Sequence, residues 1–146
     1  MIIGVGVDLV EVESFASQLD SPGTVYAHAF TGQEQRTAKN RAAVSGSAGA
    51  HLAARWAAKE AFIKAWSAAL IAAPPPVSQE DLVWSQIEVV PDRWGRPSLT
   101  IHEPLASMVT ASLEERYGPG STAWHVSLSH DGGMAMATVL GERRTS

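Results

Sequence analysis

Hydrophobic and polar residues alternate at the start of the chain with the period of a β-strand. Between residues 2 and 10, one face carries Ile3, Val5, Val7 and Leu9, and the other carries Ile2, Gly4, Gly6, Asp8 and Val10. Glycine weakens a strand, so two glycines on the face of Asp8 indicate that another part of the chain approaches this face closely.

The longest helical pattern covers residues 51–70, which are rich in alanine and contain neither glycine nor proline. Three prolines, 74–76, are predicted to end this helix. A capping box at 31–34 predicts a short polar helix that runs to about Asn40. The segment 45–49, with two glycines, predicts a flexible loop between the two helices.

The second half of the chain predicts an antiparallel sheet and one helix. The strand candidates are 86–91, 98–101, 124–129 and 134–140, the last two forming a hairpin. The helix is expected at 104–117, with Gly118 as its C-cap, and residues 142–146 are expected to be a frayed tail. The fold class is therefore α+β, with an antiparallel sheet packed against a long central helix in a single domain, 1–146.

Composition excludes several classes of protein. The chain has 146 residues, 45% hydrophobic and 18% charged, which fits one globular domain with a core of its own. A net charge of −4 argues against binding nucleic acid along its phosphate backbone. The N-terminus has no basic region, no apolar run approaches the roughly 20 residues of a membrane span, and there is no cysteine. We expect a cytoplasmic protein without a membrane partner.

Candidate chemistry begins with Asp8. An aspartate beside Gly6 on a strand face is a candidate oxygen ligand for a hard cation. The alternative is an ordinary surface aspartate at the end of an edge strand.

The helix at 51–70 carries the second candidate. Glu60 and Lys64 lie four residues apart, beside an apolar stripe into which Lys59 intrudes, and both are predicted to be half buried. A carboxylate with a lysine suits a magnesium ion that holds phosphate oxygens. The alternative is a stabilising i,i+4 ion pair. Positive charge is concentrated on this helix, at His51, Arg55, Lys59 and Lys64.

The third candidate is the strand end at 126–130. Ser129 and His130 are neighbours on a strand and point to opposite faces, so they cannot form a nucleophile–base hydrogen bond. No G-x-S-x-G motif surrounds the serine. We therefore reject a serine hydrolase.

Four segments in this order resemble the holo-[acyl-carrier-protein] synthase family of phosphopantetheinyl transferases, and actinobacterial members in particular. They are GVGVDLVEV at 4–12, RWAAKEAFIKAW at 55–66, WGRP at 94–97 and HVSLSHDGG at 125–133. The resemblance implies the 4′-phosphopantetheinyl transferase fold and a homotrimer with active sites between subunits. It implies transfer of 4′-phosphopantetheine from coenzyme A to a serine of an apo acyl carrier protein, with release of 3′,5′-ADP.

The resemblance also implies roles for single residues. Asp8 and Glu60 would hold Mg²⁺, and Lys64 would contact the phosphates of coenzyme A. Residues expected to line the coenzyme A site are Arg55, Gly95, Pro97, Ser129 and His130. Either Glu60, acting through a water, or Asp8 could be the base for the attacking serine.

The chain departs from the family pattern at three places. Ser14 stands where a basic residue often attracts the acidic carrier protein, which leaves Arg36, Lys39 and Arg41 as possible substitutes. Ser67 replaces a frequent glycine, and 42–50 replaces a more basic stretch, so Lys39 and Arg41 are also candidates for holding the 3′-phosphate.

Two other functions fit the same residues. A magnesium-dependent coenzyme A pyrophosphohydrolase would use water in place of the serine. A non-catalytic coenzyme A-binding subunit would bind but not react. Whether the carrier protein serves fatty acid biosynthesis or a polyketide pathway stays open.

Overall fold

A computed structural model describes residues 1–45 and 47–146. The strands are β1 (Ile2–Glu11), β2 (Ile87–Pro91), β3 (Pro97–Ile101), β4 (Gly120–Asp131) and β5 (Met134–Thr145). The α-helices are α1 (Val12–Leu19), α2 (Gly32–Asn40), α3 (Ala42–Ser45), α4 (Ala48–Ala69) and α5 (Leu105–Tyr117), and short 3₁₀ helices are η1 (Val25–His28), η2 (Gln79–Asp81) and η3 (Trp84–Gln86).

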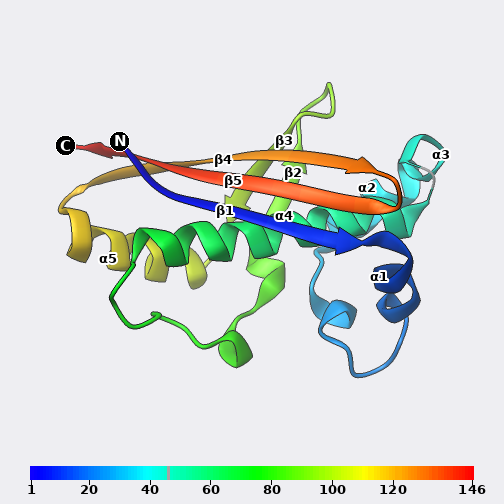
Figure 1. The fold of residues 1–146 in the computed structure, drawn as a ribbon, viewed down its shortest axis with the longest axis horizontal. Helices are drawn as coiled ribbons and strands as arrows, with labels where there is room; N and C mark the ends of the chain where they lie inside the picture. Colours follow the sequence, from blue (N-terminus) through cyan, green and yellow to red (C-terminus); the bar gives the residue numbers. More distant parts are fainter. Residues whose placement is uncertain (46) are drawn as a thin grey trace.

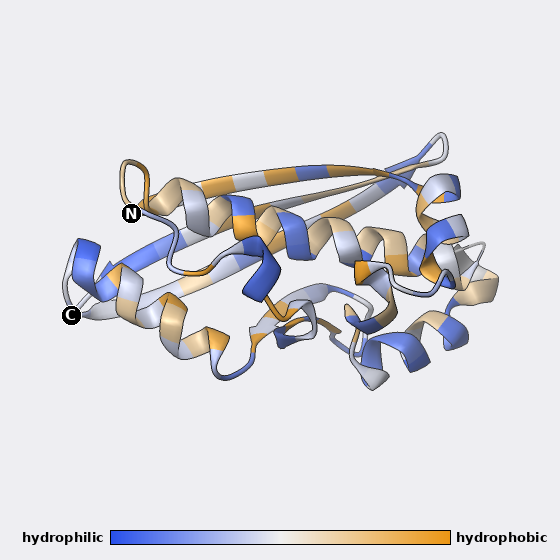
Figure 2. Cartoon of the chain, turned by 90° about the horizontal axis from the view of Figure 1, so that it is seen from below, coloured by the Kyte–Doolittle hydropathy of each residue, from blue (hydrophilic) through white to orange (hydrophobic). Residues whose placement is uncertain are grey.

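The long strands form an antiparallel sheet in the order β1-β5-β4, and β2 pairs with β3 in a separate hairpin. The helix α4 runs along one face of the larger sheet, with α5 at the end that holds both termini and α1, α2 and α3 at the other (Figure 1). Seen from below, α4 lies in front of the strands, and its hydrophobic and pale residues are interrupted by a few hydrophilic ones (Figure 2). The α+β class with a long central helix is confirmed.

The two glycines of β1 allow α4 to approach the sheet. A Cβ atom on Gly4 would lie 2.1 Å from the Ala65 carbonyl oxygen, and one on Gly6 would lie 2.0 Å from that of Ala61. No side chain fits at either position, and alanines on the facing side of α4 keep the helix thin there. The close approach predicted for this face of β1 is thus confirmed, and Asp8 points toward α4.

A buried ion pair joins α4 to α2. Lys59 is fully buried, and its ammonium donates to Glu34 Oε1 at 2.8 Å and to the carbonyl oxygens of Trp84 and Ile87. Glu34 accepts the Val89 amide at 3.0 Å. Every hydrogen of this ammonium is used inside the protein, so Lys59 stabilises the fold and does not face the candidate site.

The predicted capping box is present: Thr31 accepts from the Glu34 amide, and Glu34 accepts from the Thr31 amide. The predicted loop 45–49 is partly wrong, because α4 begins at Ala48, capped by the Ser47 side chain at the Ala50 amide. Gly46, within that loop, lies outside the described residues. The helix α4 ends at Ala69, before the prolines.

The frayed tail predicted at 142–146 is also wrong, since β5 continues to Thr145. Arg143 is 3% exposed, and its guanidinium donates to Thr122 Oγ1 and to the Gly118 carbonyl oxygen. The first strand of the chain and the last are held together here, because the Arg143 amide donates to the Met1 carbonyl oxygen at 2.7 Å. Across residues 1–45 and 47–146, no helix is long and apolar enough to cross a membrane.

Candidate active site

Asp8 and Lys64 meet between β1 and α4. Asp8 is 8% exposed, and its Oδ1 accepts a hydrogen bond from Lys64 Nζ at 3.0 Å. The same ammonium donates to the Val7 carbonyl oxygen at 3.0 Å. Lys64 was predicted to be half buried, but 56% of its side chain is exposed, because only its tip reaches back to the strand. Its remaining hydrogen faces solvent at the mouth of the site.

Glu60 lies one helical turn before Lys64 and is half-buried, as predicted. Burial and the nearby charge of Asp8 raise the pKa of Glu60 to about 7, although Lys64 acts in the opposite direction. Two carboxylates this close repel each other when both are ionised, and the protein supplies one exposed lysine to offset them.

This arrangement fits a bound divalent cation. Asp8 Oδ2 is buried and accepts from no amide, hydroxyl or ammonium group in the described part of the chain. The neighbouring Glu60 carboxyl can donate to the Asp8 carboxylate only while Glu60 is protonated. No group of three or more histidine, cysteine, aspartate or glutamate side chains with metal-site geometry occurs in residues 1–45 and 47–146. Two carboxylates with room for other oxygen ligands suit magnesium, which keeps waters and substrate phosphates in its shell.

A cavity of about 220 Å³ opens beside the carboxylates, between the end of β1, α1, η1 and α4. Its polar lining consists of Asp8, Glu11, Ser14, Gln18, Tyr26 and Glu60. No lysine or arginine lines it, so the basic side chain that Ser14 replaces has no substitute inside this cavity.

A cationic cluster surrounds the first turns of α4. His51 lies within electrostatic range of Arg55, Arg41 and His130. Burial, with the charges of these three residues, lowers the pKa of His51 to about 4, so its imidazole is neutral at pH 7. Burial lowers the pKa of Arg55 to about 10, which leaves it protonated. Arg55 and His130, both predicted for the coenzyme A site, therefore gather in one protomer at a place that favours an anion.

Of the other predicted residues, only Gly95 is in contact with a member of this cluster. Gly95 sits in the β2–β3 turn with φ of +85°, and a Cβ atom there would lie 3.1 Å from the guanidinium of Arg41. Pro97 begins β3 directly after this turn. Ser129 is exposed on β4, on the face opposite to that of Val126 and Leu128. The structure thus brings Gly95 to Arg41, and it brings neither Gly95 nor Pro97 against Asp8.

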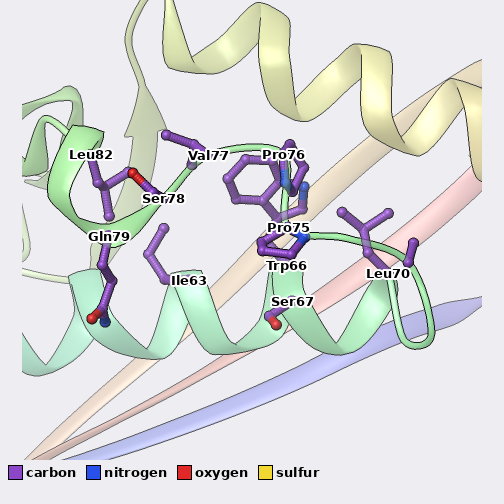
Figure 3. A pocket seen from close by; sticks show the side chains of 11 residues that line it. Ile63, Trp66, Ser67, Leu70, Pro75, Pro76, Val77, Ser78, Gln79 and Leu82 are labelled. Atoms are coloured by element: carbon purple, nitrogen blue, oxygen red, sulfur yellow. The ribbon is translucent and has the colours of Figure 1, made fainter.

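A groove continues from Lys64 along the C-terminal half of α4. One cavity is bordered by Lys64, Ser67 and Ile71. It shares Ile63 and Ser67 with a neighbouring cavity of about 330 Å³, which the loop after α4 closes. Figure 3 shows this second cavity, with Ile63, Trp66 and Ser67 from α4 opposite Pro76, Val77, Ser78 and Gln79. The lining mixes apolar side chains with hydroxyl and amide groups.

Sequence reasoning missed Tyr26. It lies in η1, far from the other site residues along the chain, and yet it lines the same cavity as Asp8 and Glu60. No motif surrounds it, and only the packing of η1 against α4 brings it there.

Comparison with known proteins places this geometry in a family. Residues 4–138 match the family model described as the 4′-phosphopantetheinyl transferase superfamily. The chain is 44% identical to a holo-[acyl-carrier-protein] synthase of Corynebacterium glutamicum strain R over 140 residues, which is 95% of this chain and 97% of the relative. It is 45% identical to that of Mycobacterium tuberculosis strain H37Rv over 141 residues, 97% of each chain.

A solved structure titled as an ACPS-CoA complex from Chronobacterium ammoniagenes has the same fold. It superposes with a TM-score of 0.82 at 42% identity, covering 97% of both chains.

Proposed function

The chain belongs to the 4′-phosphopantetheinyl transferase superfamily, and we propose that it acts as a holo-[acyl-carrier-protein] synthase. It would move 4′-phosphopantetheine from coenzyme A to a serine of an apo acyl carrier protein. The observation that carries the proposal is the pairing of Asp8 with Glu60 beside Lys64, in a chain whose full-length relatives bear this name.

The reaction exchanges one phosphorus–oxygen bond for another. The serine Oγ attacks the β-phosphate of coenzyme A, the pyrophosphate bond breaks, and 3′,5′-ADP leaves with the electron pair. The serine proton passes to a carboxylate of the pair, Asp8 or Glu60, either directly or through a water. The main barrier to this reaction is the negative charge on the two phosphates, which repels the attacking oxygen and which the site must offset.

Asp8 and Glu60 are the residues that would hold Mg²⁺. When bound, the ion would draw charge from the pyrophosphate and keep both carboxylates ionised at neutral pH. Lys64 would turn its ammonium from Asp8 toward the phosphates, because a metal on the carboxylate replaces the lysine as its partner. The 56% exposure of Lys64 supports this role, since the side chain is free to move outward.

The cationic cluster would hold the nucleotide end of coenzyme A. Arg55 is half-buried and protonated, lies one helical turn before Lys59, and is within electrostatic range of the buried Glu34 and of Arg41. The guanidinium groups of Arg41 and Arg55 suit the 3′-phosphate, and Arg41 is favoured over Lys39 because Lys39 lines a different cavity, near Asp20.

The groove beyond Lys64 would take the pantetheine arm. Pantetheine carries amide groups between short aliphatic segments, and the cavity shown in Figure 3 offers mostly apolar side chains together with the polar groups of Ser67, Ser78 and Gln79. The groove starts at Lys64, next to the proposed position of the phosphates. Ser67, in place of a frequent glycine, adds a hydroxyl to its floor.

The enzyme would be a cytoplasmic homotrimer. Val5, Val7 and Leu9 on β1 are 53%, 52% and 60% exposed, and Met136 of β5 lies beside Leu9 in the sheet register and is 41% exposed. This is the sheet face away from α4. An uncovered apolar face of this kind marks an interface, and in a homo-oligomer with closed symmetry another copy of the chain covers it.

A mass measurement tests the function. The protein is incubated with coenzyme A, Mg²⁺ and an apo acyl carrier protein, and the intact carrier is weighed with and without EDTA. We expect a gain of one phosphopantetheine group, blocked by EDTA, with release of 3′,5′-ADP. Consumption of coenzyme A without any gain in carrier mass would identify a pyrophosphohydrolase instead. Coenzyme A binding without turnover, for several carriers, would identify a non-catalytic subunit.

A further inference from the structure

Tyr26 lines the cavity that holds the carboxylate pair, and it also borders the neighbouring cavity that Lys39 lines. Its phenol lies within electrostatic range of Glu60 and Asp8. The ring is held on two sides: it contacts Phe15 of α1 edge to face at 4.8 Å between centroids, and Trp56 of α4 at 5.0 Å. Trp56 is one helical turn before Glu60. The ring therefore has little freedom, and the packing of α1, η1 and α4 fixes the position of its hydroxyl oxygen, while the O–H bond can still rotate toward an acceptor.

The hydroxyl of Tyr26 has no hydrogen-bond partner among residues 1–45 and 47–146. Neither Asp8 nor Glu60 accepts from it, although both are near enough for their charges, after burial, to raise its pKa. A phenol in a half-buried position normally finds an acceptor. The other tyrosine of the chain follows this rule: Tyr117 donates to the Ala69 carbonyl oxygen at 2.6 Å.

The space in front of Tyr26 fits a small hydroxylated group. The cavity of about 220 Å³ is lined by Asp8 and Glu60, by Tyr26, and by Ser14 and Gln18 of α1. A serine side chain inside this cavity would lie beside Tyr26 as well as beside the two carboxylates. The phenol can donate to the serine Oγ while the serine proton points to a carboxylate.

We propose that Tyr26 holds the acceptor serine of the carrier protein: its hydroxyl donates a hydrogen bond to the serine Oγ and orients it beside the Asp8–Glu60 pair. This inference rests on the proposed transferase function and adds a residue to the acceptor side of the site. The phenol takes part in no bond making or breaking. It restricts where the Oγ lies when the Oγ–phosphorus bond forms.

The variant Tyr26→Phe tests the role, because it removes one oxygen and keeps the ring contacts with Phe15 and Trp56. We expect kcat/KM for the carrier protein to fall about three- to tenfold, the usual effect of one hydrogen bond. The affinities for Mg²⁺ and coenzyme A, measured by calorimetry, should stay unchanged. The matched control is Tyr117→Phe, which also removes a hydroxyl but lies outside this cavity and should keep wild-type kcat/KM.

A second measurement observes the contact directly. With both tyrosines replaced by 3-fluorotyrosine, each gives a ¹⁹F resonance that the two phenylalanine variants assign. Adding apo carrier in the presence of Mg²⁺ and 3′,5′-ADP should shift the Tyr26 resonance more than a carrier whose serine is replaced by alanine, and should leave Tyr117 unmoved.

These experiments distinguish a failure of the role proposed for Tyr26 from a failure of the proposed transferase function. Transfer by the wild type with an equal kcat/KM in Tyr26→Phe, or equal shifts with both carriers, would overturn the role of Tyr26 and leave the transferase intact. A loss of Mg²⁺ affinity in Tyr26→Phe would overturn it too, because the phenol would then serve the metal and not the serine. Failure of the wild type to modify any carrier would remove the proposed function itself and the inference with it.

Discussion

The ammonium of Lys64 reaches back from α4 to Asp8 on β1, where it donates to Oδ1 at 3.0 Å. The sequence suggested a different partner, Glu60, four residues earlier on the same helix. Because the lysine bonds to the strand, Glu60 keeps a carboxylate that faces Asp8, with no cation between them in the described residues. The site is therefore a pair of carboxylates with a movable lysine at its edge, which is an arrangement suited to exchanging the lysine for a metal ion.

Replacing Glu60 by glutamine should abolish activity and keep the fold. The amide is nearly the same size but cannot hold a divalent cation as a carboxylate does, so we expect the transfer rate to fall about 100-fold or more. The rate is measured as holo-carrier formed per minute, and folding by thermal melting. The control is Glu115→Gln, an exposed glutamate on α5. A near-normal rate in Glu60→Gln would contradict the metal assignment.

The stability of the metal-free protein should depend on pH through Glu60. Its pKa rises from 4.5 to about 7 on folding, so between these values the folded chain binds a proton that the unfolded chain has released. The contribution of Glu60 to the free energy of unfolding is then full below pH 4.5 and is lost as pH rises through 7.

Urea denaturation with EDTA, at pH 5 and pH 8, measures this effect. His51, with its lowered pKa, gains stability as pH rises and acts in the opposite direction, so the wild type is compared with Glu60→Gln. The stability advantage of the variant should grow from pH 5 to pH 8. Adding Mg²⁺ at pH 8 should stabilise the wild type but not the variant. A constant difference at both pH values would show that Glu60 is ionised throughout.

Lys59 and Lys64 should respond to substitution in opposite ways. Lys59→Met leaves the Glu34 carboxylate buried without its cation, so we expect a loss of about 3–5 kcal/mol in the free energy of unfolding. Adding Glu34→Gln should recover part of this loss, because a neutral amide is less costly to bury. Lys64→Met, at an exposed position, should change stability little and lower the transfer rate. A large stability loss in Lys64→Met with full activity would contradict these assignments.

The apolar face of the sheet should govern assembly. A lysine at Val7, in the middle of the face, cannot be buried without a partner charge, so Val7→Lys should dissociate the trimer proposed above. Native mass spectrometry and analytical ultracentrifugation give the mass. The control is Val83→Lys, the same substitution outside the sheet. Val83 is 49% exposed and Val7 is 52% exposed, so the two valines are comparable. A monomeric wild type, or a trimeric Val7→Lys, would exclude this interface.

The sequence was sufficient to predict those elements whose structure is decided by residues close together in the chain. The alternation in β1, the capping box at Thr31 and the glycine after Tyr117 each act within a few residues, and the corresponding elements are present. The two glycines on the face of Asp8 also predicted that another part of the chain, which is α4, would approach this face closely. Resemblance in four segments then placed Asp8, Glu60 and Lys64 in one site, which their separation in the chain alone could not do.

Tertiary packing decided the rest, because side chains distant in sequence set the environment of each group. The helical wheel places Lys59 in the apolar stripe of α4 but names no partner for it, and only the strand β2 and the helix α2 bury it against Glu34. The C-terminal residues, polar and seemingly frayed, are ordered because Arg143 finds acceptors near α5 and β4. Tyr26 joins the carboxylates only through ring contacts with Phe15 and Trp56. Sequence by itself determined most of the helices and strands and predicted Asp8 and Glu60 as the metal-binding pair, and three-dimensional contacts determined that Lys59 is structural and that Tyr26 lines the same cavity as this pair.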